Sequence, residues 1–144
     1  MCTICHKTEF KRKIAETDIP CYKVMRFENG QYYTPYYNMQ MEIGMRYDNM
    51  DEETITDEVK SIDIWWGDWN KFTEIEGGFF HSYINFYSAT QQLNKNKVKD
   101  VGYHIIKCII PKGTEYIAGF EINYNQPVYA SKSIVLQKKV FSHD

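Results

Sequence analysis

The most specific chemical pattern in this chain lies near its start, where Cys2, Cys5 and His6 form a C-x-x-C-H string. This string is the attachment signature of c-type haem, in which two thiols bind the haem and the imidazole is an axial ligand. With Cys21, the same residues could instead hold zinc, which suits thiolate and imidazole ligands. Haem attachment ordinarily takes place outside the cytosol, and the spacing to Cys21 is irregular for zinc. We therefore expect a plain N-terminal segment without a metal.

A second pattern, His81 next to Ser82, suggests a base beside a nucleophile. Adjacent residues of a strand point to opposite faces, so these two side chains do not readily hydrogen-bond to each other. The chain also contains no P-loop, H-E-x-x-H, G-x-S-x-G or G-x-G-x-x-G string. This argues against the commonest nucleotide-hydrolysing, zinc-protease, esterase and dehydrogenase classes. The sequence nominates no catalytic residue, no metal ligand and no cofactor.

Residues 48–68 carry eight acidic side chains against Lys60 alone, and three tryptophans follow or overlap them at Trp65, Trp66 and Trp69. The acidic spacing does not match a calcium-binding loop, so we expect a solvated acidic face or loop. The tryptophans either form a stacking platform for a ligand or cover one end of the core.

The length and composition indicate one globular domain over residues 1–144, in which residues 1–18 are expected to be loosely ordered. The chain has a formal net charge of −2, with 43% hydrophobic and 25% charged residues, and a pI near 6.1, which argues against bulk nucleic-acid binding. We expect a cytoplasmic protein without a membrane segment, whose cysteines are thiols. The 12 tyrosines suit either a β-rich core or a ligand cleft.

Local patterns predict an α+β domain, mostly an antiparallel sheet with one or two short helices. A tight turn is expected at Asn29 and Gly30, because this pair favours positive φ. A helix is expected from about 89 to 96, capped by Ser88, with Ala89 and Leu93 on its buried side. Residues 111–113 should form a turn with Pro at its second position. Strands are expected at 21–26, after Gly77–Gly78, at 103–110 (central and buried on both faces), at 114–120 (returning), at 128–130 and at 133–140, while 31–37 suits an edge strand or loop.

Three segments carry a resemblance to known proteins: residues 21–26 (CYKVMR), 78–83 (GFFHSY) and 107–117 (KCIIPKGTEYI). In this order they resemble short uncharacterised proteins of gut Bacteroidales and their phages and, more distantly, the ADP-ribosyltransferase-like fold. The resemblance implies a first strand that presents Arg or His, a second that presents an aromatic-Ser element before a helix, and a later strand that bears a catalytic Glu.

Carried over residue by residue, the resemblance implies that Arg26 or Lys23 holds phosphate or ribose and that Ser82 supports the nicotinamide ribose. The third element departs from the pattern, since residues 129–136 contain no Glu to stabilise the developing positive charge of the transferred sugar. We therefore expect ligand-binding residues without catalytic ones. The predicted set is Lys23, Arg26, Phe80, His81, Ser82 and Tyr83, with Phe80 or Tyr83 stacking on the ligand.

Three functions remain open on this basis. The leading hypothesis is a small cytoplasmic protein that binds a nucleotide-like ligand (NAD, ADP-ribose or a cyclic nucleotide), as a catalytically degenerate ADP-ribosyltransferase-like domain of phage origin. The second is an active ADP-ribosyl transferase or hydrolase whose acid is Glu115 or Glu121. The third is a protein-interaction or structural module, such as a homo-oligomer, that uses the three tryptophans and the tyrosine-rich segment as its contact face.

Overall fold

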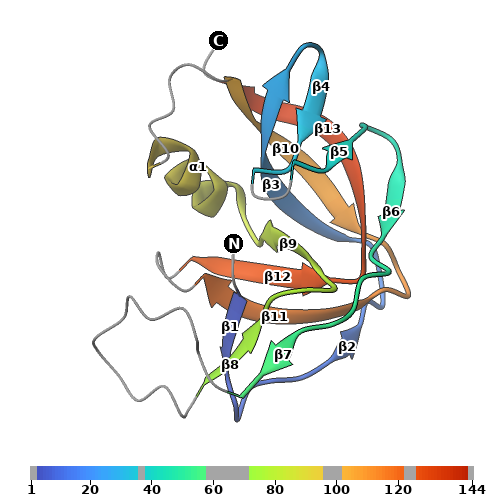
Figure 1. Ribbon diagram of the computed structural model, residues 1–144, viewed down its shortest axis with the longest axis vertical. Coiled ribbons are helices and arrows are strands. Elements are labelled where there is room, and N and C mark those ends of the chain that lie inside the picture. The colour runs from blue at the N-terminus through green and yellow to red at the C-terminus, as the bar shows by residue number, and fades with distance from the viewer. Residues whose placement is uncertain (1–2, 36–37, 58–71, 96–101, 122–125, 143–144) are drawn as a thin grey trace.

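The computed structural model of this chain describes residues 3–35, 38–57, 72–95, 102–121 and 126–142 (Figure 1). Within these ranges every strand pairing is antiparallel, which confirms the expected mainly antiparallel sheet. These ranges contain thirteen strands and one helix: β1 (Thr3–His6), β2 (Lys13–Ile14), β3 (Ile19–Glu28), β4 (Gln31–Tyr33), β5 (Gln40–Met41), β6 (Arg46–Asp48), β7 (Ile55–Thr56), β8 (Phe72–Ile75), β9 (Phe80–Tyr83), α1 (Phe86–Lys95), β10 (Gly102–Ile110), β11 (Glu115–Glu121), β12 (Pro127–Ser131) and β13 (Ser133–Ser142).

The strands form a single sheet that curls into roughly half of a barrel (Figure 1). Along its main path the order is β6-β13-β10-β3-β9-β12-β11-β1-β8-β7, while β2 pairs with β11, β4 with β3, and β5 with β4. The short strand β9 lies in the middle of this order. It joins the part of the curl built around β3 and β10 to the part built around β11 and β12.

Strands β3 and β10 are the long central pair of the first part. Antiparallel pairing joins them along their length, and β13 covers the other edge of β10. Ile105 and Ile106 point to opposite faces of β10 and both are fully buried, which confirms the prediction of a strand covered on both sides. The predicted turn into β4 is also confirmed, since Asn29 and Gly30 have φ values of 52° and 78°.

The segment after β10 departs from the expectation. Residues 111–113 do form a turn, but Pro111 is its first residue, because the Thr114 N–H donates to the Pro111 carbonyl at 3.1 Å. Strand β11 does not return alongside β10; it pairs with β12 and β1 instead. The physical reason is that both edges of β10 are already occupied by β3 and β13. The chain therefore crosses here to the second part of the curl.

The helix α1 begins at Phe86, three residues before the predicted start. Its cap explains the difference: the side-chain oxygen of Asn85 accepts a hydrogen bond from the Ser88 backbone N–H at 2.8 Å, so Asn85 and not Ser88 satisfies the first turn. Ala89 and Leu93 are buried, as predicted. They pack onto the face of the sheet formed by β3, β9 and β10.

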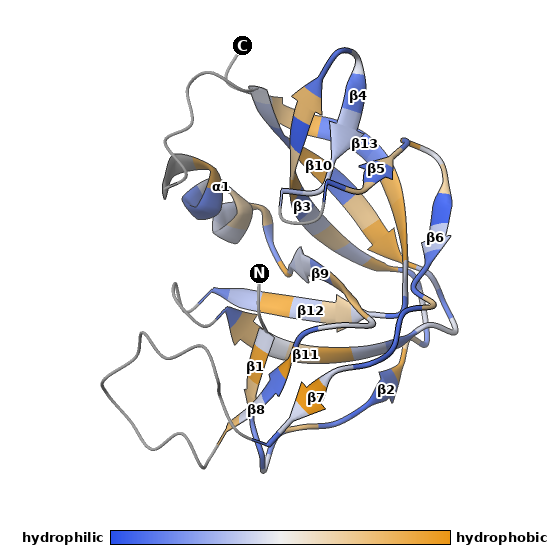
Figure 2. Ribbon diagram, in the orientation of Figure 1, coloured by the Kyte–Doolittle hydropathy of each residue, from blue (hydrophilic) through white to orange (hydrophobic). Residues whose placement is uncertain are grey.

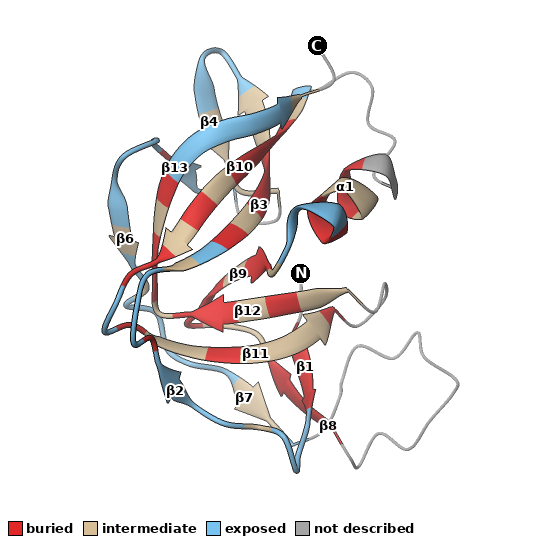
Figure 3. Cartoon of the chain, turned by 180° about the vertical axis from the view of Figure 1, so that it is seen from behind, coloured by how far each residue is buried: buried red, intermediate tan, exposed pale blue. Residues whose placement is uncertain are grey.

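Hydrophobic and buried residues recur along the central strands, and β1 and β8 are largely buried as well (Figures 2 and 3). One cluster includes Met25, Ile106, Ile134 and Leu136, and a second lies beneath α1. Formally charged side chains are rare in this interior. Among the described residues those that are buried are Lys23, Glu74 and Glu121.

The start of the described chain is built into the sheet, although residues 1–18 were expected to be loosely ordered. Strand β1 lies between β8 and β11, and its residues Thr3, Ile4 and Cys5 are buried. Gly119 of β11 allows this approach, because a Cβ at this position would lie 2.5 Å from the Ile4 carbonyl oxygen. Pairing on both edges thus fixes β1 in place.

Candidate functional site

A pocket of about 390 Å³ opens where β3, β9 and α1 meet the residues that follow β4 and β6. Its volume lies near the lower end of the range of about 300–1,000 Å³ that is usual for small-molecule sites. Side chains that could hold a ligand stand in its wall. They are Lys23, Phe79, Phe80, His81, Tyr83 and Gln92.

The pocket exists because the sheet parts beside β3. Strand β3 pairs with β9 at Tyr22 and Tyr83, and with β4 from Arg26 and Tyr33 onward. Between these two pairings the described strands give β3 no neighbour on this edge. Lys23 lies in this interval and lines the pocket.

Two glycines set the position of β9 against this gap. Gly78 has a φ of 85°, and a Cβ on it would lie 2.7 Å from the Cα of Glu53. The Lys132 ammonium also donates to the Gly78 carbonyl at 2.6 Å. Gly77 and Gly78 therefore hold the chain in a conformation that a larger residue would strain, and the predicted glycine-flexed start of an aromatic strand is confirmed at Phe80.

Lys23 is the lysine that the described residues bury, with 8% of its surface exposed. Its Nζ donates to the His81 carbonyl oxygen at 2.6 Å, whereas the ion pairs within the described ranges join other residues. Burial lowers the pKa of Lys23, and the neighbouring thiols of Cys108 and Cys21 oppose this effect. A buried ammonium without a carboxylate partner costs stability, and such groups gather at functional sites.

The two thiols beside Lys23 belong to the core and not to the pocket wall. Cys21 and Cys108 stand opposite each other on β3 and β10 and are fully buried. Burial raises the pKa of Cys108 well above its usual value. A hydrogen bond from Cys108 lowers the pKa of Cys21, with smaller contributions from the Ser82 hydroxyl and from Lys23.

His81 is fixed in one uncharged form. Its Nε2 lies 3.0 Å from the Glu76 carbonyl oxygen, which can only accept, so Nε2 carries the proton and donates. The other nitrogen, Nδ1, therefore accepts from the Thr3 hydroxyl at 2.7 Å. Burial lowers the pKa of His81 to about 4. In this way the N-terminal string contributes Thr3 as a support for the pocket wall.

Aromatic rings form much of the remaining wall. Phe79, Phe80 and Tyr83 line the pocket, and the Tyr83 hydroxyl donates to the Glu121 carboxylate at 3.0 Å. Glu121 does not itself line the pocket. Glu115, the other acid considered for transferase chemistry, pairs with Arg12 at 2.5 Å. Neither acid is therefore placed against a ligand in this pocket.

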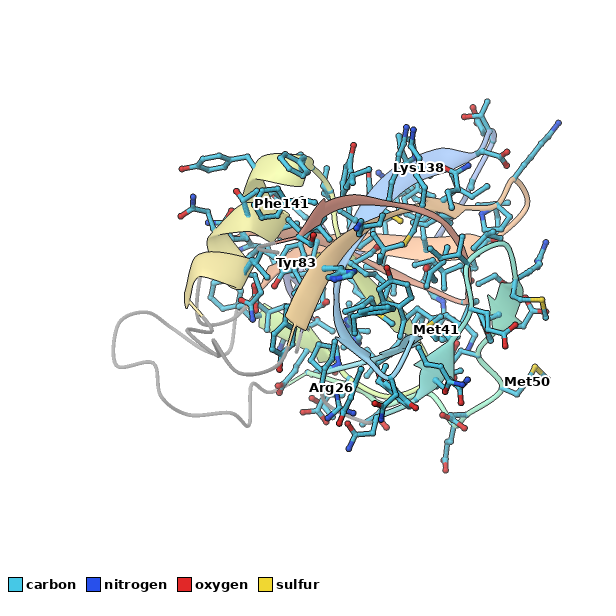
Figure 4. All side chains as sticks on the ribbon, turned by 90° about the horizontal axis from the view of Figure 1, so that it is seen from above. Arg26, Met41, Met50, Tyr83, Lys138 and Phe141 are labelled. Carbon is cyan, nitrogen blue, oxygen red and sulfur yellow. The ribbon has the colours of Figure 1, made fainter. Side chains whose placement is uncertain are left out.

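Two of the six predicted ligand-binding residues lie elsewhere. Arg26 donates to the Asn38 side chain at 2.8 Å and packs its guanidinium over the Tyr33 ring at 5.1 Å. Figure 4 shows Arg26 near the edge of the molecule, apart from Tyr83. Ser82 is fully buried beside Cys21. The structure brings the other four, which are Lys23, Phe80, His81 and Tyr83, to one pocket.

Several wall residues escaped the sequence analysis. Asp51 and Glu76, here called the wall acids, line the pocket together with Thr34 and Met39. They reach it from segments far apart in the chain, so no local spacing marks them. Asp51 belongs to the acidic stretch that was interpreted as solvated, and it is indeed exposed.

The metal and tryptophan hypotheses can be compared with the structure only in part. No group of three or more His, Cys, Asp or Glu side chains that could hold a metal occurs in the described ranges. Cys2 and the tryptophan cluster (Trp65, Trp66 and Trp69) lie outside the described residues. The His6 ring packs at a tilt of 38° against Phe72, with the ring centroids 4.5 Å apart.

Comparisons with protein-family models, with curated proteins and with solved structures found no match to this chain. In the described ranges no helix is both long and apolar enough to cross a membrane. The function is therefore argued from the pocket itself.

Proposed function

We propose that this chain is a small cytoplasmic binding protein whose pocket takes an organic anion with a planar ring, and that a cyclic mononucleotide is the nucleotide-like ligand that fits it best. The observation that carries the proposal is Lys23. It is a buried ammonium at the wall of an aromatic pocket, paired with a carbonyl and with no carboxylate among the described ion pairs. An anionic ligand would supply the missing counter-charge, and rings such as Phe79 and Phe80 would pack on a planar base.

Charge and size narrow the ligand class. Lys23 is the one cationic side chain in the pocket wall as the structure describes it, and the wall acids Asp51 and Glu76 stand in the same wall. One positive charge suits a ligand with a single negative charge, such as the phosphodiester of a cyclic mononucleotide, and the two wall acids disfavour a more highly charged anion. NAD and ADP-ribose carry a second sugar-phosphate unit, and a pocket of about 390 Å³ is small for them.

The origin of the domain is part of the proposal. A catalytically degenerate ADP-ribosyltransferase-like domain of phage origin would keep a nucleotide cleft after losing its catalytic Glu. The resemblance of residues 21–26, 78–83 and 107–117 supports this history, and Lys23 in the pocket wall fits the phosphate-holding role that the resemblance implies. Transferase activity itself has less support, because neither Glu115 nor Glu121 lines the pocket.

Calorimetry and thermal shift against cyclic AMP, cyclic GMP, AMP, ADP-ribose and NAD test the proposal. At about 100 times its Kd a ligand adds about 2.7 kcal/mol to stability, so a cyclic mononucleotide should raise Tm by several degrees. Lys23→Met should lose this shift. The matched control Lys138→Met, which changes an exposed lysine of β13 (Figure 4), should keep it. A parent protein that none of these compounds stabilises would refute the proposal.

A further inference from the structure

The Lys23 side chain also has the chemistry of a nucleophile, which anion binding does not require. It ends in a primary amine that lines the pocket, and this amine donates a hydrogen bond to the His81 carbonyl oxygen at 2.6 Å. A neutral amine has two N–H groups and one lone pair. Donation of one N–H to His81 therefore leaves the lone pair free to attack a ligand in the pocket.

None of the ion pairs in the described ranges joins this amine to a carboxylate. Cys21 lies two residues before it on β3, Cys108 pairs with Cys21 from β10, and the His81 carbonyl accepts its hydrogen bond from β9. The wall acids line the same pocket. Burial lowers the pKa of Lys23, and His81 is uncharged at neutral pH because its pKa is about 4. At neutral pH a larger share of Lys23 is therefore neutral amine than for exposed lysines.

We propose that Lys23 is a nucleophilic amine that binds ring-bearing aldehydes or ketones covalently, as imines, in this pocket. The lone pair of Nζ attacks the carbonyl carbon, and the carbonyl electron pair moves to oxygen, which takes up the proton released by nitrogen. The resulting carbinolamine then loses water as the nitrogen lone pair forms the C=N bond. Amine and aldehyde thus give imine and water, with no change of oxidation state and no further reactant.

The rest of the wall favours an aromatic carbonyl compound. Phe79, Phe80 and Tyr83 line the pocket with apolar ring atoms, against which a ligand ring would pack. Their apolar surface also keeps water from the C=N bond, which slows its hydrolysis. The inference uses the pocket of the proposed function and does not depend on its ligand, so it can hold even where no cyclic nucleotide binds.

Reductive trapping tests the inference on the full folded chain. The protein is incubated near neutral pH with benzaldehyde and sodium cyanoborohydride, which reduces imines to stable amines, and the labelled lysines are located by digestion and mass spectrometry. Lys23 should be labelled at least about tenfold faster than the exposed Lys138. Unfolding in urea should remove this difference. Lys23→Arg should abolish the fast phase, and Lys138→Arg should keep it.

The comparison of Lys23 with Lys138 is made within one protein, so it does not depend on a variant that folds. Labelling of Lys23 no faster than that of Lys138 in the folded chain would overturn the inference. Fast labelling that cyclic AMP slows supports the inference and the proposed function together. Fast labelling that every nucleotide leaves unchanged supports the inference alone, whereas nucleotide binding by calorimetry without fast labelling supports only the proposed function.

Discussion

Lowering the pH should destabilise this fold because His81 takes up a proton, and the pKa of His81 sets how much stability is lost. The ring is half-buried, accepts from Thr3 and donates to the Glu76 carbonyl, and its pKa is about 4 against a usual 6.5. Because the unfolded chain binds this proton at a higher pH than the folded chain, the stability is complete above pH 6.5 and falls as the pH drops toward 4. At about 1.4 kcal/mol per pH unit, the loss is about 3 kcal/mol.

Urea unfolding, followed by tryptophan fluorescence between about pH 4 and 8, measures this loss. His81→Gln should flatten the curve between pH 4 and 6.5, because an amide can still accept from Thr3 and donate to Glu76 but does not titrate. His6→Gln changes an exposed histidine and should leave the slope as in the parent. Acids with lowered pKa values, such as Glu53, lose stability at lower pH in every variant. A folded His81→Gln protein with the parent slope would show that His81 is not the titrating group.

Three further substitutions test the packing of the site and the sheet. Lys23→Met should raise the free energy of unfolding by about 1–3 kcal/mol at neutral pH. This gain should shrink as the pH rises toward the usual lysine pKa of 10.5 and vanish above it, where the amine is neutral in both states. A less stable variant in urea would contradict this. Gly119→Ala should lower the free energy of unfolding by about 1–3 kcal/mol, because its Cβ would lie 2.5 Å from the Ile4 carbonyl oxygen. Gly102→Ala is the control: its Cβ would meet nothing closer than 3.7 Å, so the same unfolding assay should show no loss from a clash. Asn85→Ala should lose about 1 kcal/mol with a lower Tm, because the Ser88 N–H loses the side-chain oxygen that accepts its hydrogen bond; a Tm equal to that of the parent would contradict this.

Local chemistry explains how much of the fold could be predicted from the sequence. The turn at Asn29 and Gly30, the buried face of α1 and the doubly covered strand β10 each depend on residues close in sequence, and the structure contains all three. The partner of β11 depends instead on which sheet edges distant strands have already filled. No periodicity within residues 114–120 carries that information, so the expected return alongside β10 was wrong.

The difference between features set by nearby residues and features set by tertiary contacts also applies to the residues of the site. Strand alternation already places Lys23 and Arg26 on opposite faces of β3, and Ser82 on the opposite face from His81 and Tyr83. Neither Arg26 nor Ser82 lines the pocket. Alternation alone does not separate the site residues, however, because Val24 on the face of Arg26 and Phe80 on the face of Ser82 both line it. The wall acids and Met39 reach the pocket through tertiary contacts, which a single sequence does not display.

Three features that each cost stability meet at this one pocket. The ammonium of Lys23 is buried beside a carbonyl, and the β3 edge lacks a strand neighbour between its pairings with β9 and β4. Gly78, whose φ of 85° excludes larger residues, loses more backbone freedom on folding than they would. A methionine at position 23 would remove the first cost with little change in volume. Proteins keep strain and buried charge mainly where function requires them. The coincidence of all three at a ring-lined cavity therefore favours a selected binding site over an accident of packing.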